Sequence, residues 1–373
     1  MIYFDHNATT PVDPRVLEAM SPYLSTFFGN PSSLYRAGRV ARSALETARE
    51  QVAALVGAHS SEIVFTSGGT EANNLALKGL AAAFPPGELA VDSSAHPSLL
   101  EPVDSLKAGG WAVHLLPLDG NGLIDARSIP PLLGKNLRFA AVMLANNETG
   151  VIQDMSAIVS AFRAGNVIVL CDAVQAAGKI PVDFHSSGVH SMSLSSHKIY
   201  GPKGVGALVI SKELELTPIL YGGGQEKGLR GGTENVPAIV GFGKAAEIAL
   251  DELQQRRKHL SELRERLEKA MRKMPNVTIF GAGAKRLPNT VQFGVEGMDG
   301  EMMLMEFDRK GIAVSSGSAC ASGAGEPSHV LTAMGVPETL ARSAVRVSFG
   351  VSNTLADVDK FVEILRNMLP RIH

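Results

Sequence analysis

The most informative stretch of the chain is Ser195-Ser196-His197-Lys198-Ile199-Tyr200-Gly201-Pro202-Lys203-Gly204. It follows an apolar, strand-like segment, so a lysine flanked by hydroxyl and imidazole side chains enters a glycine-rich turn. A buried lysine has a lowered pKa and can form a Schiff base with an aldehyde cofactor. Taken alone, the stretch is more typical of a surface turn that carries lysines, and the rest of the chain decides between the two interpretations.

Short β-rich runs alternate with helical patterns around this stretch, from about residue 62 to residue 210. Such alternation is typical of βαβ units and a mainly parallel sheet. The predicted strands are 62–66, 89–93, 112–116, 139–145, 167–171, 191–194 and 205–210. Apolar residues at helical spacing predict helices over 38–56, 70–83 and 156–164. The predicted fold class is therefore α/β, with a mainly parallel seven-stranded sheet between helices.

A second domain is predicted beyond a glycine-rich loop at 222–232. Residues 251–274 are heavily charged and carry leucines along one stripe, which predicts a long packing helix. Further strands are predicted at 290–293 and 345–349. Because a chain of 373 residues is too long for one simple core, we expect two domains. They are a large one over 12–250 and a smaller α+β domain made of 1–11 and 251–373.

The composition is that of a globular protein, with 45% hydrophobic and 19% charged residues and a formal charge of −2. This charge provides no basic field for nucleic acid and no polybasic surface for a membrane. No apolar run approaches the ~20 residues of a membrane span, and the N-terminus lacks a signal-peptide pattern. We expect a cytoplasmic protein without nucleic-acid, membrane or metal partners. Cys171 and Cys320 do not suggest a disulfide framework.

A glycine-containing turn, Thr66-Ser67-Gly68-Gly69-Thr70-Glu71, follows one predicted strand and opens a helix. Free amides and the helix dipole at such a position favour a phosphate group. A helix cap formed by Thr70 is an equally good interpretation of this segment alone. A dinucleotide-like match at 241–246 lies inside a helical pattern, so it does not predict a nucleotide site.

Asp172 comes at the carboxyl end of a strongly apolar predicted strand, where open α/β sheets bind ligands. A buried carboxylate needs a partner. A protonated heterocyclic nitrogen would supply one, and the ring would become a better electron sink. Gln175 would bond a substituent of that ring. The alternative is that Asp172 caps the next helix. Cys171, one residue earlier, is expected to be a buried small hydrophobic residue.

His96 follows another predicted strand, where an imidazole could stack on a flat cofactor and transfer protons near neutral pH. Alone, it is more typical of a structural histidine. The segment 146–150, Asn146-Asn147-Glu148-Thr149-Gly150, adds polar groups at the same sheet edge.

Cys320 lies among small residues in Ser315-Ser316-Gly317-Ser318-Ala319-Cys320-Ala321-Ser322-Gly323. Such residues do not build a core, so we expect a nucleophile that reaches the substrate and then an acceptor. An incidental surface cysteine is the alternative. Arg346, on an otherwise apolar predicted strand, suits bidentate binding of a substrate carboxylate. A buried structural ion pair is the competing interpretation of Arg346.

Together these segments resemble cysteine desulfurases of the nitrogenase-associated and iron–sulfur-cluster type. Those enzymes belong to the class V aminotransferase family of fold-type I pyridoxal phosphate enzymes. The matching motifs cover nearly the whole chain, in order: 5–11, 28–33, 66–74, 146–150, 172–175, 195–204, 222–235 and 315–320. Any one of them would be weak, but their shared order makes the resemblance specific.

The resemblance implies a role for each matched residue. Lys198 would hold pyridoxal 5′-phosphate as a Schiff base, Asp172 would pair with the ring nitrogen, Gln175 would bond the phenolic oxygen, and His96 would stack on the ring. The phosphate would be held by Gly69, Thr70, Ser195 and His197, and by Thr233 of a neighbouring subunit, which implies a homodimer. Ser196 would also belong to the cofactor site. Asn147 and Arg346 would anchor the substrate carboxylate, with Asn147 also beside the cofactor.

The implied reaction removes sulfur from L-cysteine and yields L-alanine. Lys198 would remove the α-proton, and the Cys320 thiolate would attack the substrate sulfur and carry it as a persulfide. His96 would help to manage the thiol proton. The persulfide would pass to an acceptor protein, such as an iron–sulfur scaffold.

Two features depart from the pattern. Ser196 stands where many relatives have glycine or alanine, and only 27 residues follow Arg346, without the longer tail that engages a scaffold protein. The spacing from Cys320 to 326–329 is typical of the long-loop, scaffold-delivering branch. Three alternatives stay open: a pyridoxal phosphate aminotransferase or lyase without a cysteine nucleophile, a selenocysteine lyase, and a sulfur-carrier scaffold with a vestigial site.

Overall fold

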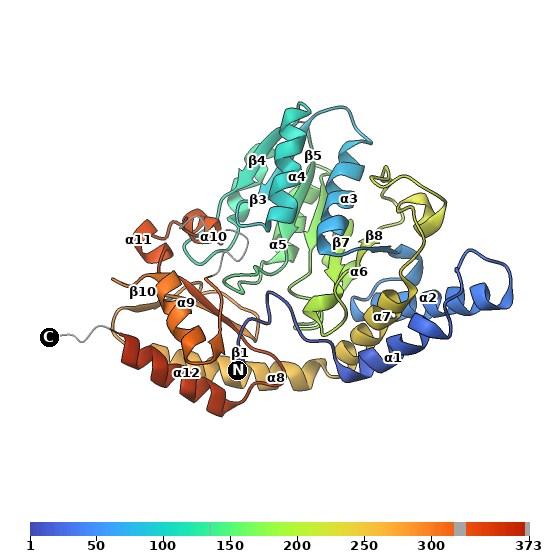
Figure 1. The fold of residues 1–373 in the computed structure, drawn as a ribbon. Coiled ribbons are helices and arrows are strands. Elements are labelled where there is room, and N and C mark those ends of the chain that lie inside the picture. The colour runs from blue at the N-terminus through green and yellow to red at the C-terminus, as the bar shows by residue number, and fades with distance from the viewer. Residues whose placement is uncertain (135, 317–325, 370–373) are drawn as a thin grey trace.

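The computed structural model of the chain describes residues 1–134, 136–316 and 326–369. Its largest sheet has seven strands in the order β2-β8-β7-β6-β5-β3-β4 (Figure 1). Four neighbouring pairs are parallel, and β8 is antiparallel to both of its neighbours. The strands are β2 Ile63–Thr66, β3 Glu88–Asp92, β4 Ala112–Leu116, β5 Leu137–Met143, β6 Ile168–Asp172, β7 Ser191–Ser195 and β8 Gly206–Ile210. The predicted α/β fold with a mainly parallel seven-stranded sheet is confirmed.

Helices cover both faces of this sheet. One face packs against α2 Arg36–Leu55, α5 Met155–Arg163 and α7 Val236–Asp251. The opposite face packs against α3 Gly69–Ala81 and α4 Pro97–Ala108. The sheet is therefore the middle of three layers, which is how a largely parallel sheet buries both of its apolar faces.

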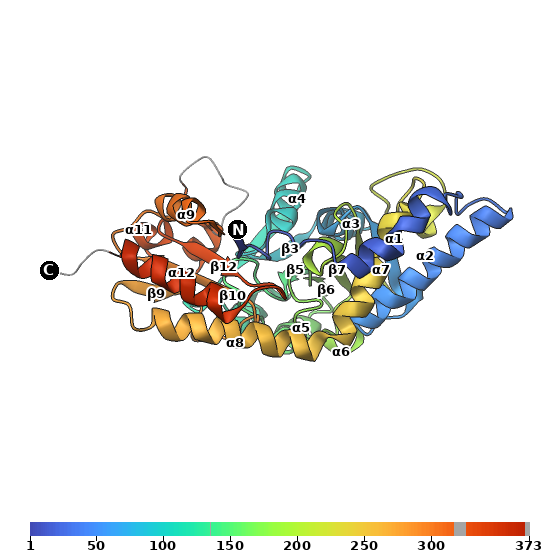
Figure 2. The ribbon, with the colours of Figure 1, turned by 60° about the horizontal axis from the view of Figure 1, so that its bottom comes forward.

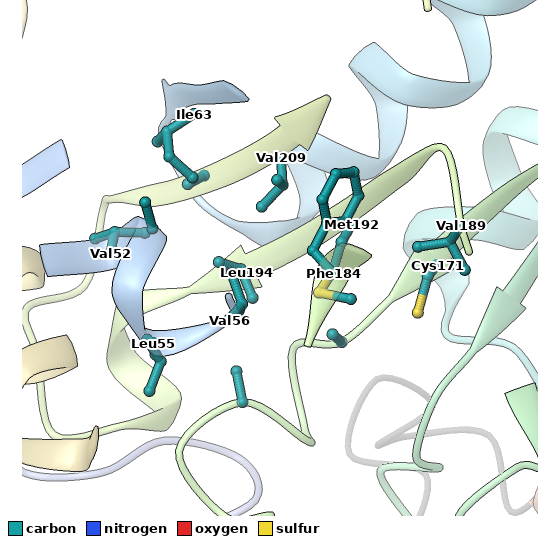
Figure 3. Close-up of a cluster of buried hydrophobic side chains, with 14 of the residues drawn as sticks. Val52, Leu55, Val56, Ile63, Cys171, Phe184, Val189, Met192, Leu194 and Val209 are labelled. Carbon is teal, nitrogen blue, oxygen red and sulfur yellow. The ribbon is translucent and has the colours of Figure 1, made fainter. Parts of the chain in front are cut away.

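Figure 3 shows part of the core between the sheet and α2. Val52 of α2, Met192 and Leu194 of β7 and Val209 of β8 all belong to one buried cluster. Met192 and Leu194 are two residues apart, so both side chains leave the strand on the same face. Cys171 lies in the same cluster, where burial raises the pKa of its thiol. The prediction that Cys171 is a buried hydrophobic residue is confirmed.

A second hydrophobic core surrounds a three-stranded antiparallel sheet in the order β12-β10-β9. Its elements are β9 Val277–Ile279, β10 Thr290–Val295, β12 Val345–Ser348, α8 Leu253–Met271, α9 Gly300–Arg309 and α12 Leu355–Met368. Figure 2 shows α8 running from the end of α7 alongside this second core. The long charged helix predicted over 251–274 is α8. It begins later than predicted because Glu252 leaves helical geometry (φ −93°, ψ 3°) between α7 and α8.

The N-terminal segment contacts both cores. β1 Ile2–Tyr3 pairs in parallel with β11 Ile312–Ala313, and Phe4 is fully buried in the second core. The chain then returns to the large sheet, where the Thr10 N–H donates to the carbonyl oxygen of His197 at 3.0 Å. These contacts agree with a fold-back of the N-terminus, whereas the predicted domain boundaries stay a prediction.

Several helices were not predicted, namely α1 Pro14–Ser25, α4, α6 Phe184–Ser187, α9, α10 His329–Ala333, α11 Glu338–Ala341 and α12. Proline is part of the reason. α1 and α4 each start with proline in the first turn and contain a second one, Pro22 or Pro102, although internal proline ordinarily signals a helix end. In the part of the chain that the structure describes, no helix is both long enough and apolar enough to cross a bilayer.

His6, in the N-terminal segment, is expected to make stability depend on pH. The residue is 2% exposed, and its Nδ1 lies 3.2 Å from the carbonyl oxygen of Ser348, so a neutral ring with a proton on Nδ1 fits the place. Burial lowers the pKa of His6 to about 4, against about 6.5 in the unfolded chain. As the pH falls from 6.5 toward 4, the unfolded state takes up a proton that the folded state does not, so stability is lost.

We therefore expect this group to lower the free energy of unfolding by about 2 kcal/mol between pH 7 and pH 5. Urea unfolding of the wild type and His6→Gln at both pH values measures the effect, and the variant should be less pH-dependent by that amount. His185→Gln, at a histidine with a 49% exposed side chain, is the matched control. An unchanged pH dependence in His6→Gln would contradict the prediction.

Candidate functional site

A cavity of about 440 Å³ lies at the carboxyl edge of the large sheet, where the second core meets it. Its walls come from the ends of β5, β6 and β7, the first turns of α3 and α4, the N-terminal segment, α10 and β12. The lining residues are Asn7, Ala8, Gly69, Thr70, Asn73, His96, Pro97, Ser98, Met143, Asn147, Glu148, Asp172, Val174, Gln175, Ser195, His197, Lys198, His329 and Arg346. Every predicted site residue is among them except Ser196, Thr233 and Cys320.

These three exceptions differ in kind. Ser196 is fully buried, and its hydroxyl faces Gly201, where an added Cβ would lie 2.0 Å from Oγ. The side chain therefore points away from the cavity. Thr233 lines a separate groove together with Phe28. Cys320 lies outside the described residues.

Lys198 ends a short 3₁₀ turn, Ser196–Lys198, directly after β7. Its Nζ donates to the carbonyl oxygens of Asn7 and Ala8, at 2.6 Å each. Two residues on, Tyr200 adopts a φ of 71°, a costly conformation for a non-glycine residue. A bond from the Tyr200 N–H to Oγ1 of Thr10 at 2.8 Å helps to hold it. The sharp turn thus presents the lysine amine at the end of a buried strand.

Asp172 is the last residue of β6 and is 3% exposed. Its Oδ1 accepts from the Val174 N–H at 2.9 Å, and its Oδ2 accepts from Nδ2 of Asn73 at 2.8 Å. Asn73 also donates to the hydroxyl of Ser98 at 2.8 Å. Among the described residues, only neutral donors bond to this carboxylate, so its negative charge is available to a cationic group in the cavity.

His96 is the N-cap residue of α4. Its Nδ1 accepts a hydrogen bond from the Ser98 N–H at 3.0 Å, which places the proton of the neutral ring on Nε2. Burial lowers the pKa of His96, and Lys198 lowers it further, while the Asp172 carboxylate raises it. Near pH 7 the ring is neutral, and its remaining hydrogen-bonding group is the Nε2–H donor.

The start of α3 has the character of an anion site. Its N-cap residue is Gly68, so no side-chain acceptor caps the first turn there. Thr70 lies inside that turn, and the interpretation of Thr70 as the helix cap is therefore wrong. A Cβ added at Gly69 would lie 2.8 Å from Cγ2 of Val174, so glycine lets the helix end approach the sheet closely. Free amides at a helix N-terminus bind phosphate well.

Ser195 and His197 line the cavity beside Lys198. The Nδ1 of His197 lies 3.1 Å from Oγ1 of Thr9. Burial, followed by the charge of Lys198, lowers the pKa of His197 to about 4. His197 is therefore neutral at pH 7, and it could serve a phosphate as a hydrogen-bond donor rather than as a cation.

Arg346 reaches the cavity from β12, and its side chain is 3% exposed. Its Nη2 pairs with Oδ1 of Asp5 at 2.8 Å, and its Nη1 donates to the carbonyl oxygen of Asn147 at 3.1 Å. Its Nε has no hydrogen-bond partner within the described ranges. One guanidinium group therefore combines a structural ion pair with a buried Nε–H donor that no described residue accepts from.

Five polar residues of the cavity had no predicted role: Asn7, Asn73, Ser98, Glu148 and His329. Glu148 is 2% exposed and accepts from the Ser328 hydroxyl at 2.5 Å. His329 places Nε2 3.0 Å from the carbonyl oxygen of Ala95. Helical spacing could have suggested Asn73, which lies one turn after Thr70, and Glu148 falls inside the noted segment 146–150. No strand-end pattern marks His329.

The cavity thus combines an amine, a carboxylate, a helix N-terminus and a guanidinium group. A molecule with an aldehyde, a basic ring nitrogen and a phosphate would find a partner for each group: Lys198 for the aldehyde, Asp172 for the nitrogen, and the start of α3 for the phosphate. The donor set and the cradle at Gly69 fit pyridoxal phosphate.

The family model described as Aminotransferase class-V matches residues 2–361. The chain is 42% identical to a cysteine desulfurase of Trichormus azollae, over all of this chain and 94% of that protein. It is similar to a solved NifS-like protein, with a TM-score of 0.92, 36% identity and 98% of each chain covered. It is also similar to SspA in complex with cysteine, with a TM-score of 0.83 and 34% identity over 94% of this chain and 99% of that one.

Proposed function

The chain belongs to the class V aminotransferase family and is a cysteine desulfurase, and from this premise we propose that its cavity binds pyridoxal phosphate and L-cysteine and releases L-alanine. The family is pyridoxal phosphate-dependent. The observation that carries the proposal is the convergence of Lys198 and Asp172 on one cavity of about 440 Å³. A lysine alone would be a weak indication. A lysine and a buried carboxylate at adjacent strand ends together supply the amine that binds the aldehyde and the anion that pairs with the ring nitrogen.

When bound, the cofactor supplies an aldehyde for the lysine and a protonated ring that withdraws electrons from the α-carbon of the substrate. Lys198 would bind the aldehyde carbon, Asp172 would keep the ring nitrogen protonated, and Gln175 would bond the ring oxygen. His96 would lie against the ring. The phosphate would be held by Gly69, Thr70, Ser195 and His197, together with Thr233 of a second copy of the chain. Ser196 is left out, because its hydroxyl faces Gly201.

Arg346 and Asn147 would fix the substrate carboxylate, which orients the α-proton toward Lys198. Lys198 Nζ, as a neutral amine, would take that proton. In the tautomer that Ser98 selects, His96 can accept a proton only at Nδ1, where the Ser98 N–H now donates. If His96 is to take up the thiol proton, the capping hydrogen bond from the Ser98 N–H to Nδ1 must therefore break.

Cys320 would receive the sulfur. Its thiolate forms a bond to the substrate sulfur while the carbon–sulfur bond breaks. The electron pair stays on carbon, which then takes a proton to give alanine. The resulting persulfide would pass to an acceptor protein, such as an iron–sulfur scaffold.

A second copy of the chain is the proposed partner of the surface around α1 and α2. Several large apolar side chains are exposed there, and a monomer rarely leaves so many together. They are Leu24 (64%), Phe27 (41%), Phe28 (78%), Leu34 (89%) and Tyr35 (62%). Thr233 lies in the same groove as Phe27 and Phe28, so a copy seated here would meet it. Sedimentation should give a dimer at micromolar concentration, and a monomer would refute this assignment.

The function is tested by incubating the purified protein, loaded with pyridoxal phosphate, with L-cysteine. We expect alanine to accumulate and the Cys320 peptide to gain the mass of one sulfur atom in mass spectrometry. L-Serine, which lacks sulfur, is the control. A protein that binds no pyridoxal phosphate would instead support a scaffold with a vestigial site, and faster turnover of L-selenocysteine would support a selenocysteine lyase.

A further inference from the structure

Lys179 is an almost wholly buried lysine that the mechanism above does not use. It is 7% exposed, and it lies behind the cavity wall rather than in it. Its Nζ donates to Oε1 of Gln175 at 2.7 Å and to Oδ1 of Asn7 at 3.0 Å. Gln175 and Asn7 are both lining residues. Lys179 therefore does not line the cavity, but it bonds directly to two residues that do.

Among the described residues, no ion pair accounts for the burial of this lysine. Burial lowers the pKa of Lys179 well below the ordinary range, and the charges of Lys198 and Arg346 lower it further. Its Nζ donates to two amide oxygens, and neither of these acceptors carries a charge. Burying so long a side chain costs conformational entropy. Because no charge pairing offsets this cost, we look for another role for the two hydrogen bonds of Lys179.

The local sequence aims Lys179 at Gln175. Gly178 has a φ of 72°, and a Cβ there would lie 2.7 Å from Cγ2 of Ile199. Glycine thus permits a tight turn, in which the Lys179 N–H donates to the carbonyl oxygen of Ala176 at 3.0 Å. The turn folds the lysine back beneath the residue four positions earlier.

The partners of Lys179 decide how the amide of Gln175 is oriented. The oxygen and nitrogen ends of an amide are nearly equal in shape, but lysine has no acceptor and can meet only the oxygen. The nitrogen Nε2 must then point the other way, where it donates to the carbonyl oxygen of Asn7 at 3.0 Å. The same carbonyl oxygen accepts from Nζ of Lys198 at 2.6 Å.

We propose that Lys179 is a positioning residue that locks the amide of Gln175 with its N–H₂ group on the cavity side. Gln175 then offers a donor, not an acceptor, to the ring oxygen of the cofactor. The inference rests on the proposed function, because that oxygen belongs to pyridoxal phosphate. Without Lys179 the amide can turn over, and its oxygen would face an anionic ring oxygen and repel it.

The test is titration of the apo-protein with pyridoxal phosphate, followed by absorbance. Lys179→Met is expected to bind about 10-fold more weakly than the wild type, the size of one charge-assisted hydrogen bond. The pH midpoint of the bound-cofactor absorbance should rise, because the ring oxygen loses a donor. Lys179→Gln keeps an N–H donor and should bind nearly as well as the wild type. Lys285→Met, at an exposed lysine, is the matched control.

A double-mutant cycle separates positioning from a general structural role. In a Gln175→Met background, Lys179→Met should cause no further loss of affinity. Wild-type affinity in Lys179→Met would overturn the inference, as would an equal loss with and without Gln175. If Lys179→Met does not fold, equal affinity losses in Lys179→Gln and Gln175→Met would overturn it. A wild-type protein that binds no pyridoxal phosphate would instead refute the proposed function.

Discussion

Lys198→Ala is expected to lower alanine formation from L-cysteine by about 10⁴-fold or more. The Nζ of Lys198 would both attach the cofactor and take the α-proton, so one substitution removes two functions of the same atom. Alanine is measured with pyridoxal phosphate in excess, so that weaker binding does not hide the chemical defect. Borohydride reduction followed by mass spectrometry should leave the cofactor on the Lys198 peptide of the wild type and on no peptide of the variant.

Two further variants serve as controls for Lys198→Ala. Lys198→Arg keeps a cation opposite the carbonyl oxygens of Asn7 and Ala8, which now accept from Nζ at 2.6 Å. It cannot form an imine and should be as inactive as the alanine variant. Lys203→Ala, at an exposed lysine of the same turn, should keep full activity. Substantial turnover in Lys198→Ala would show that another group performs the chemistry.

The large sheet could be predicted from the sequence because its signals are local. Each strand lies within two residues of its predicted bounds, since short apolar runs separated by helical patterns fix strand positions. The same logic found Asp172 and Ser195, which are the last residues of β6 and β7. Carboxyl ends of parallel strands meet at one edge, so chain position alone brought these residues together.

The remaining contacts of the site depend on long-range packing that no local pattern encodes. Lys179 and Asn7 are 172 positions apart, and Arg346 and Asp5 are 341 apart, yet each pair is joined by a hydrogen bond. The direction of the Ser196 hydroxyl is set by its packing against Gly201. In each case the sequence shows which residue is present, but only the structure shows which residue it contacts.

The second large effect is expected at Cys320, and it depends on how the chain is held on both sides of that residue. Before it, Ser315 pairs with Arg346 through two main-chain bonds, at 2.7 and 3.2 Å. After it, Ser328 donates to the cavity carboxylate of Glu148 at 2.5 Å. The five residues from Ser315 to Cys320 span at most about 18 Å when extended. Both described residues that flank the Cys320 segment, Ser315 and Ser328, thus bond to residues of the cavity wall, Arg346 and Glu148.

Cys320→Ala is accordingly expected to lower alanine and persulfide formation by about 10³-fold or more, while pyridoxal phosphate binds as in the wild type. Removing the thiol leaves the substrate sulfur without an attacking group, but it leaves Lys198, Asp172 and Arg346 in place. The absorbance of the bound cofactor, recorded before and after L-cysteine is added, separates lost binding from lost sulfur transfer. Cys171→Ala, at the core cysteine, is the control and should form persulfide normally. Full turnover in Cys320→Ala would mean that the carbon–sulfur bond breaks by elimination, as in a lyase without a cysteine nucleophile.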